Sequence, residues 1–368
     1  PVTSRSLFRV ASHSKTFTSV AIARLVERGA LRYDDRIADH LDWAANGDIG
    51  GRTIGELLAH GGGVIRDGTD GNFWQLQRSF PDRDALIAVA TASDVAVIPA
   101  NERFKYSNIA YGVLGLVIEA VTGSDYATHV HRDVVDQLGL ADTGAEYDPQ
   151  RADDYVTGYT SLNYADRRLP IDPIDTRALA SATGFYSTAS DLVRYFSAHT
   201  IGIEGLLSDE SKRRMQRPGW PHDDVDSYGL GLGCRRVAGR NLVGHGGGFP
   251  GQLTKSQLDP LAGIAVSVLT NAIDGFAQLY NDVFWKLLAD GPHVTIAHAA
   301  REEINFCVHA INRPPANLFD TQLAAAFCSP EYPAAYSSVV QRILNKRPNK
   351  GEQRTDWRRR PLTDAQVD

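Results

Sequence analysis

Ser12 and Lys15 lie three positions apart in the segment Ser12-His13-Ser14-Lys15, near the start of the 368-residue chain. Side chains three positions apart share one face of a helix, so the Ser12 hydroxyl can approach the Lys15 amine. A serine hydroxyl is a useful nucleophile only when a neighbour takes its proton. A lysine takes it only when burial or nearby positive charge lowers its pKa. The spacing predicts nucleophilic catalysis, but it also fits an N-cap serine followed by a surface lysine.

A second pattern, Tyr106-Ser107-Asn108, comes just before an apolar segment. A tyrosine beside the nucleophile can carry a proton between it and the leaving group, and an asparagine amide can hold a substrate carbonyl and Lys15 together. An ordinary turn fits the same three residues.

A third pattern, His245 followed by Gly246, Gly247 and Gly248, closes an expected strand. Glycines let a substrate backbone approach closely and leave backbone N–H groups free to point at a developing oxyanion. A glycine-rich turn with a surface histidine fits equally well.

The hydrophobic periodicity predicts helices first and strands later, an α+β order with a sheet backed by helices. The expected helices cover residues 8–29 (with Ser12 as cap and Gly29 at the end), 53–60, 109–122, 187–198 and 276–289. The expected strands cover residues 228–237, 241–245, 251–259 and 262–271.

Taken together and in order, the three motifs resemble those of the serine β-lactamase and D,D-peptidase superfamily, in its class C-like branch with D-aminopeptidases and family VIII esterases. The resemblance covers residues 3–288 and includes the segments FRVASHSKTFTSVAIARLVERGAL, TIGELLAHGGG, NERFKYSNIAYGVLGLVIEAVTG, SATGFYSTASDLVRY and LVGHGGGFPGQ. It implies an antiparallel sheet flanked by helices.

The resemblance also implies roles for the residues of the motifs. Ser12 would be acylated, Lys15 and Tyr106 would handle its proton, and Asn108 would position substrate. His245 stands where many relatives have the lysine of a K-T-G triplet, Gly247 belongs to the same substrate-binding stretch, and the N–H groups of Ser12 and Gly248 would form the oxyanion hole. Which group acts as general base stays open.

Two features depart from the family pattern. Only eleven residues precede Ser12, so the two strands that the family places there are missing, and we expect an unpaired sheet edge and an uncovered apolar face. Histidine in the third motif is mostly neutral at pH 7, which argues against strong selection of a substrate carboxylate. The chain begins with Pro1, so we expect it to start inside a longer product or after processing.

The last part of the chain resembles the central part of a ribonuclease D-type 3′–5′ exonuclease, a partial ribonuclease H-like α/β segment. The segments HAAREEINFCVHA, LFDTQLAAAFC, AYSSVVQRILN and KGEQRTDWRRRPLTDAQVD carry this resemblance. Such enzymes hold two metals with four acidic residues. Here Glu303 replaces one aspartate, and the first and third acidic motifs are not found, so we expect no nuclease activity.

Composition excludes little. The net charge of −6 gives no whole-chain reason to expect nucleic acid or an anionic membrane, although residues 341–360 are basic and could touch phosphates weakly. The three cysteines, Cys234, Cys307 and Cys328, are too few and too scattered for a disulfide framework or a zinc site. We find no membrane-spanning segment and no motif for a metal or other cofactor.

We therefore expect a serine hydrolase domain over residues 1–290 and a partial exonuclease-like segment over 291–368. The leading hypothesis is a Ser12 acyl-enzyme acting on a small ester, amide or D-amino-acid peptide, without a cofactor. The alternatives are a catalytically silent penicillin-recognising receptor and a nucleic-acid-processing protein. Two incomplete families could reflect a natural fusion, a join of two genes or trimmed modules; a join best explains two half-built cores.

Overall fold

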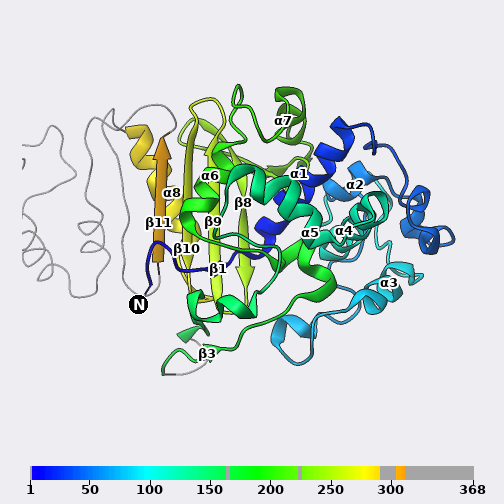
Figure 1. Ribbon diagram of the computed structural model, residues 1–368, viewed down its shortest axis with the longest axis horizontal. Helices are drawn as coiled ribbons and strands as arrows, with labels where there is room; N and C mark the ends of the chain where they lie inside the picture. The colour runs from blue at the N-terminus through cyan, green and yellow to red at the C-terminus, as the bar shows by residue number, and fades with distance from the viewer. Residues whose placement is uncertain (1, 163–165, 223–225, 291–303, 311–368) are drawn as a thin grey trace, which may run out of the picture.

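The computed structural model describes residues 2–162, 166–222, 226–290 and 304–310, and it places a sheet beside a helical region (Figure 1). The large sheet is antiparallel throughout, in the order β11-β10-β9-β8-β7-β6-β5. Its strands are β5 (Trp220–Pro221), β6 (Asp226–Tyr228), β7 (Gly233–Val237), β8 (Arg240–Phe249), β9 (Gln252–Asp259), β10 (Ile264–Thr270) and β11 (Ile304–Ala310).

The α-helices of the described residues are α1 (Ser14–Glu27), α2 (Ile54–Leu58), α3 (Arg83–Thr91), α4 (Asn108–Thr122), α5 (Tyr126–Val130), α6 (Ala189–Ser197), α7 (Asp209–Met215) and α8 (Ala277–Asp290). Two small ribbons pair β1 (Phe8–Arg9) with β4 (Tyr186–Ser187) and β2 (Gly158–Tyr159) with β3 (Pro170–Ile171). The predicted α+β architecture, an antiparallel sheet flanked by helices, is confirmed.

The first helix begins later than the sequence predicts. Phe8 and Arg9 pair with β4 instead of joining the helix, and residues Ala11–His13 form a 3₁₀ turn, η1, ahead of α1. Ser12 lies in this turn, and His13, not Ser12, occupies the N-cap position without a side-chain cap. The predicted end is right, because Gly29 adopts a φ of +72° just after α1.

Other predicted helix ends are confirmed by their caps. Thr53 and Glu56 form a reciprocal capping box at the start of α2. The Ser107 hydroxyl accepts from the Ala110 N–H at the start of α4, which ends at Gly123 with a φ of +65°. These local hydrogen bonds satisfy backbone groups that have no partner within the helix.

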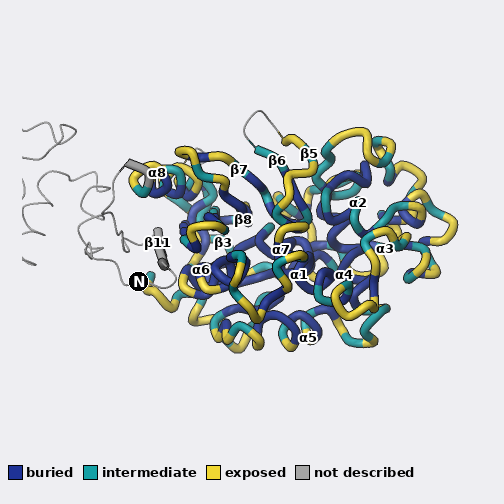
Figure 2. Tube along the Cα trace, turned by 90° about the horizontal axis from the view of Figure 1, so that it is seen from above, coloured by how far each residue is buried: buried dark blue, intermediate teal, exposed yellow. Residues whose placement is uncertain are grey.

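Both faces of the sheet are covered by helices. On one face, Trp285 and Phe284 of α8 join a cluster with Val266, Val268 and Leu242. On the other face, α6 packs against β9, β10 and β11, and the turn η1 packs against β8. Figure 2 shows α1 as a buried helix in the middle of the molecule.

The far edge of the sheet differs from expectation. Strand β11 pairs with β10 in antiparallel register, from Ile264 opposite Ala310 to Thr270 opposite Ile304. The expected unpaired edge is therefore filled by a strand from beyond residue 290, because the backbone groups of β10 need partners. The exposed apolar side chains near this edge, Phe276, Leu279, Val283 and Leu287, lie on and just before helix α8 and not on the sheet.

Among the described residues, no helix is long and apolar enough to span a membrane. Glu303, Cys328 and the basic stretch 341–360 lie outside the described residues.

Candidate active site

Ser12 is presented by a tight turn at the start of α1. Ala11, the residue before it, is fully buried and holds a φ of +47°, a left-handed conformation that is costly for a residue other than glycine. The Ser14 hydroxyl donates to the Ala11 carbonyl at 2.6 Å and accepts the Phe185 N–H at 3.0 Å. These bonds hold the turn against the residue that precedes β4.

Lys15 is buried one turn later, with no solvent-exposed surface. Its Nζ donates to Asn108 Oδ1 at 2.7 Å and to the Ala182 carbonyl at 2.8 Å, and it lies 3.3 Å from Ser12 Oγ. Burial lowers the pKa of Lys15 well below its ordinary value; the nearby Asp67 carboxylate opposes that shift and Arg66 adds to it. Burial therefore favours the neutral amine over the ammonium form.

Tyr106 approaches the nucleophile from the loop that precedes α4. Its hydroxyl donates to Ser12 Oγ at 2.8 Å. Burial raises the pKa of Tyr106 above its ordinary value of 10.0, with the Ser12 hydrogen bond opposing the shift. The phenol stays protonated at neutral pH and can donate a proton.

Asn108 is oriented by a residue that the sequence analysis does not single out. Asp67 Oδ1 accepts from Asn108 Nδ2 at 2.6 Å and from Trp74 Nε1 at 3.0 Å. A carboxylate can only accept here, so the Asn108 carbonyl must face Lys15. Asp67 lies in the loop 62–80, where no periodicity or motif marks it.

His245 is held in one neutral form. Its Nδ1 lies 2.6 Å from the Gly246 carbonyl, and its Nε2 lies 2.9 Å from the Tyr228 hydroxyl. A carbonyl only accepts, so Nδ1 carries the proton and Nε2 accepts from Tyr228. Burial, with Lys15 adding to it, lowers the pKa of His245 well below 6.5. The neutral imidazole expected from the sequence fits this geometry.

The glycines after His245 continue strand β8 and do not form a turn. A Cβ at Gly247 would lie 2.2 Å from the Val10 carbonyl, so only glycine lets β8 reach the loop before Ser12. Phe249 and Gln252 close a two-residue hairpin, and antiparallel alternation then turns the Gly248 N–H away from β9. Gly248 is exposed, with its N–H on the open side of the strand.

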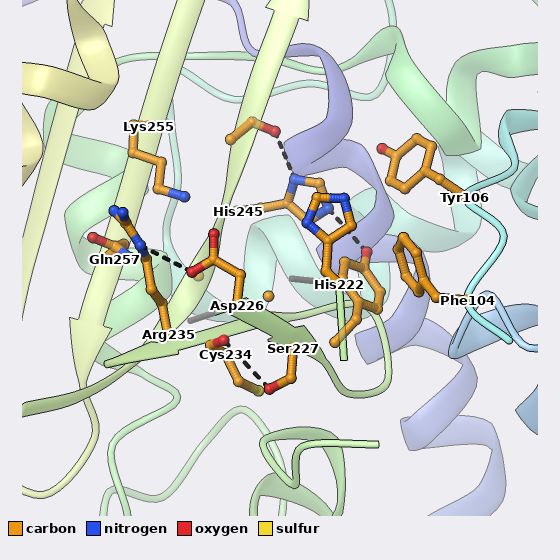
Figure 3. Close-up of a pocket in the computed structure, with 14 residues that line it drawn as sticks. Phe104, Tyr106, His222, Asp226, Ser227, Cys234, Arg235, His245, Lys255 and Gln257 are labelled. Carbon is orange, nitrogen blue, oxygen red and sulfur yellow. Dashed lines mark hydrogen bonds and ion pairs between the residues drawn. The ribbon is translucent and has the colours of Figure 1, made fainter. Parts of the chain in front are cut away.

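A pocket of about 270 Å³ opens beside this cluster (Figure 3). Tyr106, Phe104 and His245 line one part of it, and Lys255 and Arg235 line another. The structure thus gathers Ser12, Lys15, Tyr106 and Asn108 into direct contact. His245 is close, with its ring 6.5 Å from that of Tyr106.

Comparisons with known proteins agree with this geometry. The profile of the Beta-lactamase family matches residues 1–285, and that of a 3'-5' exonuclease family matches residues 266–368. Penicillin-binding protein 4* of Bacillus subtilis (strain 168) is 27% identical over 268 residues, which cover 69% of this chain and 58% of that protein.

Ribonuclease D of Shewanella sp. (strain ANA-3) is 39% identical over 95 residues, which cover 26% of this chain and 24% of that protein. Among solved structures, the octameric penicillin-binding protein homologue from Pyrococcus abyssi superposes with a TM-score of 0.70 at 26% identity, covering 78% of this chain and 67% of that one. The chain thus spans little more than half of its penicillin-binding relative and about a quarter of ribonuclease D.

The close approach at Gly247 gives a test of how the site is assembled. We expect Gly247→Ala to lower the free energy of unfolding by about 1–3 kcal/mol, because its methyl group would overlap the Val10 carbonyl. In Gly248→Ala the added carbon would lie 3.5 Å from the Leu253 side chain, an ordinary contact. Urea unfolding of both variants checks this; equal destabilisation would contradict the packing argument.

Proposed function

Because the chain belongs to the Beta-lactamase family, we propose that it is a serine hydrolase that forms an acyl-enzyme on Ser12 with a small ester, amide or D-amino-acid peptide. The observation that carries the proposal is the direct contact of a buried Lys15 amine and a Tyr106 hydroxyl with the same Ser12 oxygen. No cofactor takes part in this scheme.

The hydrogen bonds of Lys15 favour it as the general base. A neutral amine has two N–H donors and one lone pair. The carbonyl oxygens of Asn108 and Ala182 take the two donors, at 2.7 and 2.8 Å. The lone pair is then left for the Ser12 hydroxyl, 3.3 Å away. Tyr106, whose own proton is directed at Ser12 Oγ, suits the role of acid.

The reaction follows from these positions. Ser12 Oγ attacks the substrate carbonyl carbon while its proton passes to Lys15 Nζ. The oxyanion forms near the N–H groups of Ser12 and Gly248. When the tetrahedral intermediate collapses, Tyr106 protonates the leaving oxygen or nitrogen, and the Lys15 proton restores the phenol. Water then attacks the acyl-enzyme by the same route in reverse and releases the acid.

A second candidate function belongs to the C-terminal part of the chain. The match to a 3'-5' exonuclease over residues 266–368 favours contact with nucleic acid, and we place the boundary between the two parts near residue 291. The strand described in this part, β11, is nevertheless hydrogen-bonded to β10 of the large sheet. This pairing supports the serine hydrolase as the leading function.

Covalent labelling tests the nucleophile. We expect a fluorophosphonate probe to label Ser12, and Ser12→Ala to abolish labelling, because the scheme contains one activated serine. Mass spectrometry of the labelled peptide identifies the site. Labelling by fluorescent penicillin without turnover would favour a silent penicillin-recognising receptor, and a folded protein without any label would refute the proposal.

The pH profile tests the base. Lys15 is active when neutral, and its pKa is lowered, so kcat/KM for an uncharged ester should reach its plateau well below pH 10.5 and fall by about tenfold per pH unit below the pKa of the amine. Because the pKa of Tyr106 is raised, the rate should not fall as the pH approaches 10. A rate that rises only near the 10.5 of an ordinary lysine would exclude Lys15 as the base.

Nuclease activity has its own assay. We expect no release of nucleotides from the 3′ end of single-stranded RNA in the presence of Mg²⁺ or Mn²⁺, because Glu303 replaces one of the family's metal-binding aspartates. A chelator-treated sample is the control. Degradation that requires the added metal would show that the C-terminal part is an active nuclease.

A further inference from the structure

A histidine that the proposed reaction does not use lies directly against Tyr106. His60 follows helix α2, and its side chain is buried, with 1% of the residue's surface exposed. The centre of its imidazole ring lies 4.3 Å from that of the Tyr106 ring, and the two planes are tilted by 39°. The other aromatic rings around the imidazole belong to Phe104, Tyr111 and Tyr228. The Tyr106 ring is therefore packed against His60 within an aromatic cluster.

The backbone on both sides of Tyr106 is hydrogen-bonded to His60. The Lys105 N–H donates to the His60 carbonyl at 2.8 Å, and the Ser107 N–H donates to His60 Nδ1 at 3.2 Å. A backbone N–H only donates, so Nδ1 is the unprotonated nitrogen of a neutral ring and Nε2 carries the proton. Burial, with Lys15 adding to it, lowers the pKa of His60 well below 6.5 and keeps the ring neutral. One residue thus holds Tyr106 by its ring and by both of its chain neighbours.

The conformation of His60 is costly. Its φ is +58°, in the left-handed region that favours glycine, and three glycines follow it in the chain. Its Nε2 is buried and has no hydrogen-bond partner among the residues that the structure describes. Strained backbone and unpaired buried polar groups concentrate at functional sites. A glycine at position 60 would adopt this backbone without strain, so the imidazole ring is the feature that needs a reason.

We propose that His60 is a positioning residue for Tyr106, which keeps the phenol aimed at Ser12 Oγ and at the leaving group beside it. The inference rests on the proposed serine hydrolase function, in which Tyr106 protonates the leaving group. The Tyr106 hydroxyl donates to Ser12 Oγ at 2.8 Å, and a misplacement of about 1 Å can cost on the order of 100-fold in rate. Because the hydrogen bonds of His60 go to the residues on either side of Tyr106, His60 acts through that phenol.

The test uses the identity of the leaving group. Two esters share one acyl group: a nitrophenyl ester, whose phenolate departs without a proton, and an ethyl ester, whose leaving oxygen must be protonated. Their kcat/KM values report acylation, the step in which the leaving group departs. His60→Gly fits the φ of +58° and removes the imidazole. We expect it to lower kcat/KM for the ethyl ester about 10- to 100-fold more than for the nitrophenyl ester.

A double-mutant cycle shows whether His60 acts through Tyr106. Tyr106→Phe should lower the ratio of ethyl to nitrophenyl ester hydrolysis, and His60→Gly added to Tyr106→Phe should lower it no further. His60→Asn tolerates the positive φ and keeps an acceptor for the Ser107 N–H. Its ratio should lie between those of the wild type and His60→Gly, and it replaces His60→Gly if that variant does not fold. An equal loss for both esters, or a further fall of the ratio in the Tyr106→Phe background, would overturn the positioning role.

A second buried histidine provides the control. His199 is also fully buried and lies beside aromatic rings, those of Tyr195 and Phe196. His199→Asn should leave the ratio of the two esters unchanged. Rates are compared per molecule that a fluorophosphonate labels at Ser12 on long incubation. A wild-type protein without such labelling refutes the hydrolase itself, whereas a labelled protein whose leaving-group preference does not depend on His60 overturns the positioning role alone.

Discussion

The rest of the site depends on the hydrogen bonds of the buried Lys15 amine. An amine without solvent contact needs acceptors for its N–H groups, and here the side-chain oxygen of Asn108 and the backbone carbonyl of Ala182 accept them. Those two acceptors come from α4 and from the turn η11 (Ala180–Gly184), which both pack against α1. The packing of α4 and η11 against α1 therefore also positions the two acceptors of the Lys15 amine.

Strand β8 provides the second wall of the site, and its glycines let it serve two purposes. At Gly247 the strand backbone lies against the Val10 carbonyl in the loop before Ser12. Any residue with a Cβ would overlap that carbonyl. At Gly246 the missing side chain leaves room for Lys255 from the next strand. The pairing of β7 with β8 ends at Gly233 opposite Gly244, and beyond that point this edge of β8 faces the pocket and Ser12.

The far edge of the sheet shows how the two parts of the chain are connected. Residues from beyond position 290 supply β11, which pairs with β10 along its whole length. The exonuclease match begins at residue 266, inside β10, so the two family matches overlap in the sheet and in α8. The boundary that we place near residue 291 is thus a change of family resemblance, and the hydrogen bonding of the sheet continues across it.

The sequence by itself predicted the motif residues, the α+β order and most helix ends, because those depend on spacing, periodicity and local caps such as Thr53 with Glu56. It predicted the wrong start for α1, because pairing of Phe8 with Ser187 is a long-range contact. Asp67 and Lys255 were missed because no motif marks them and only the folded chain brings them to the other site residues. Only the tertiary structure decides which distant side chains are buried together. Burial in turn shifts their pKa values, as it does for Lys15 and His245.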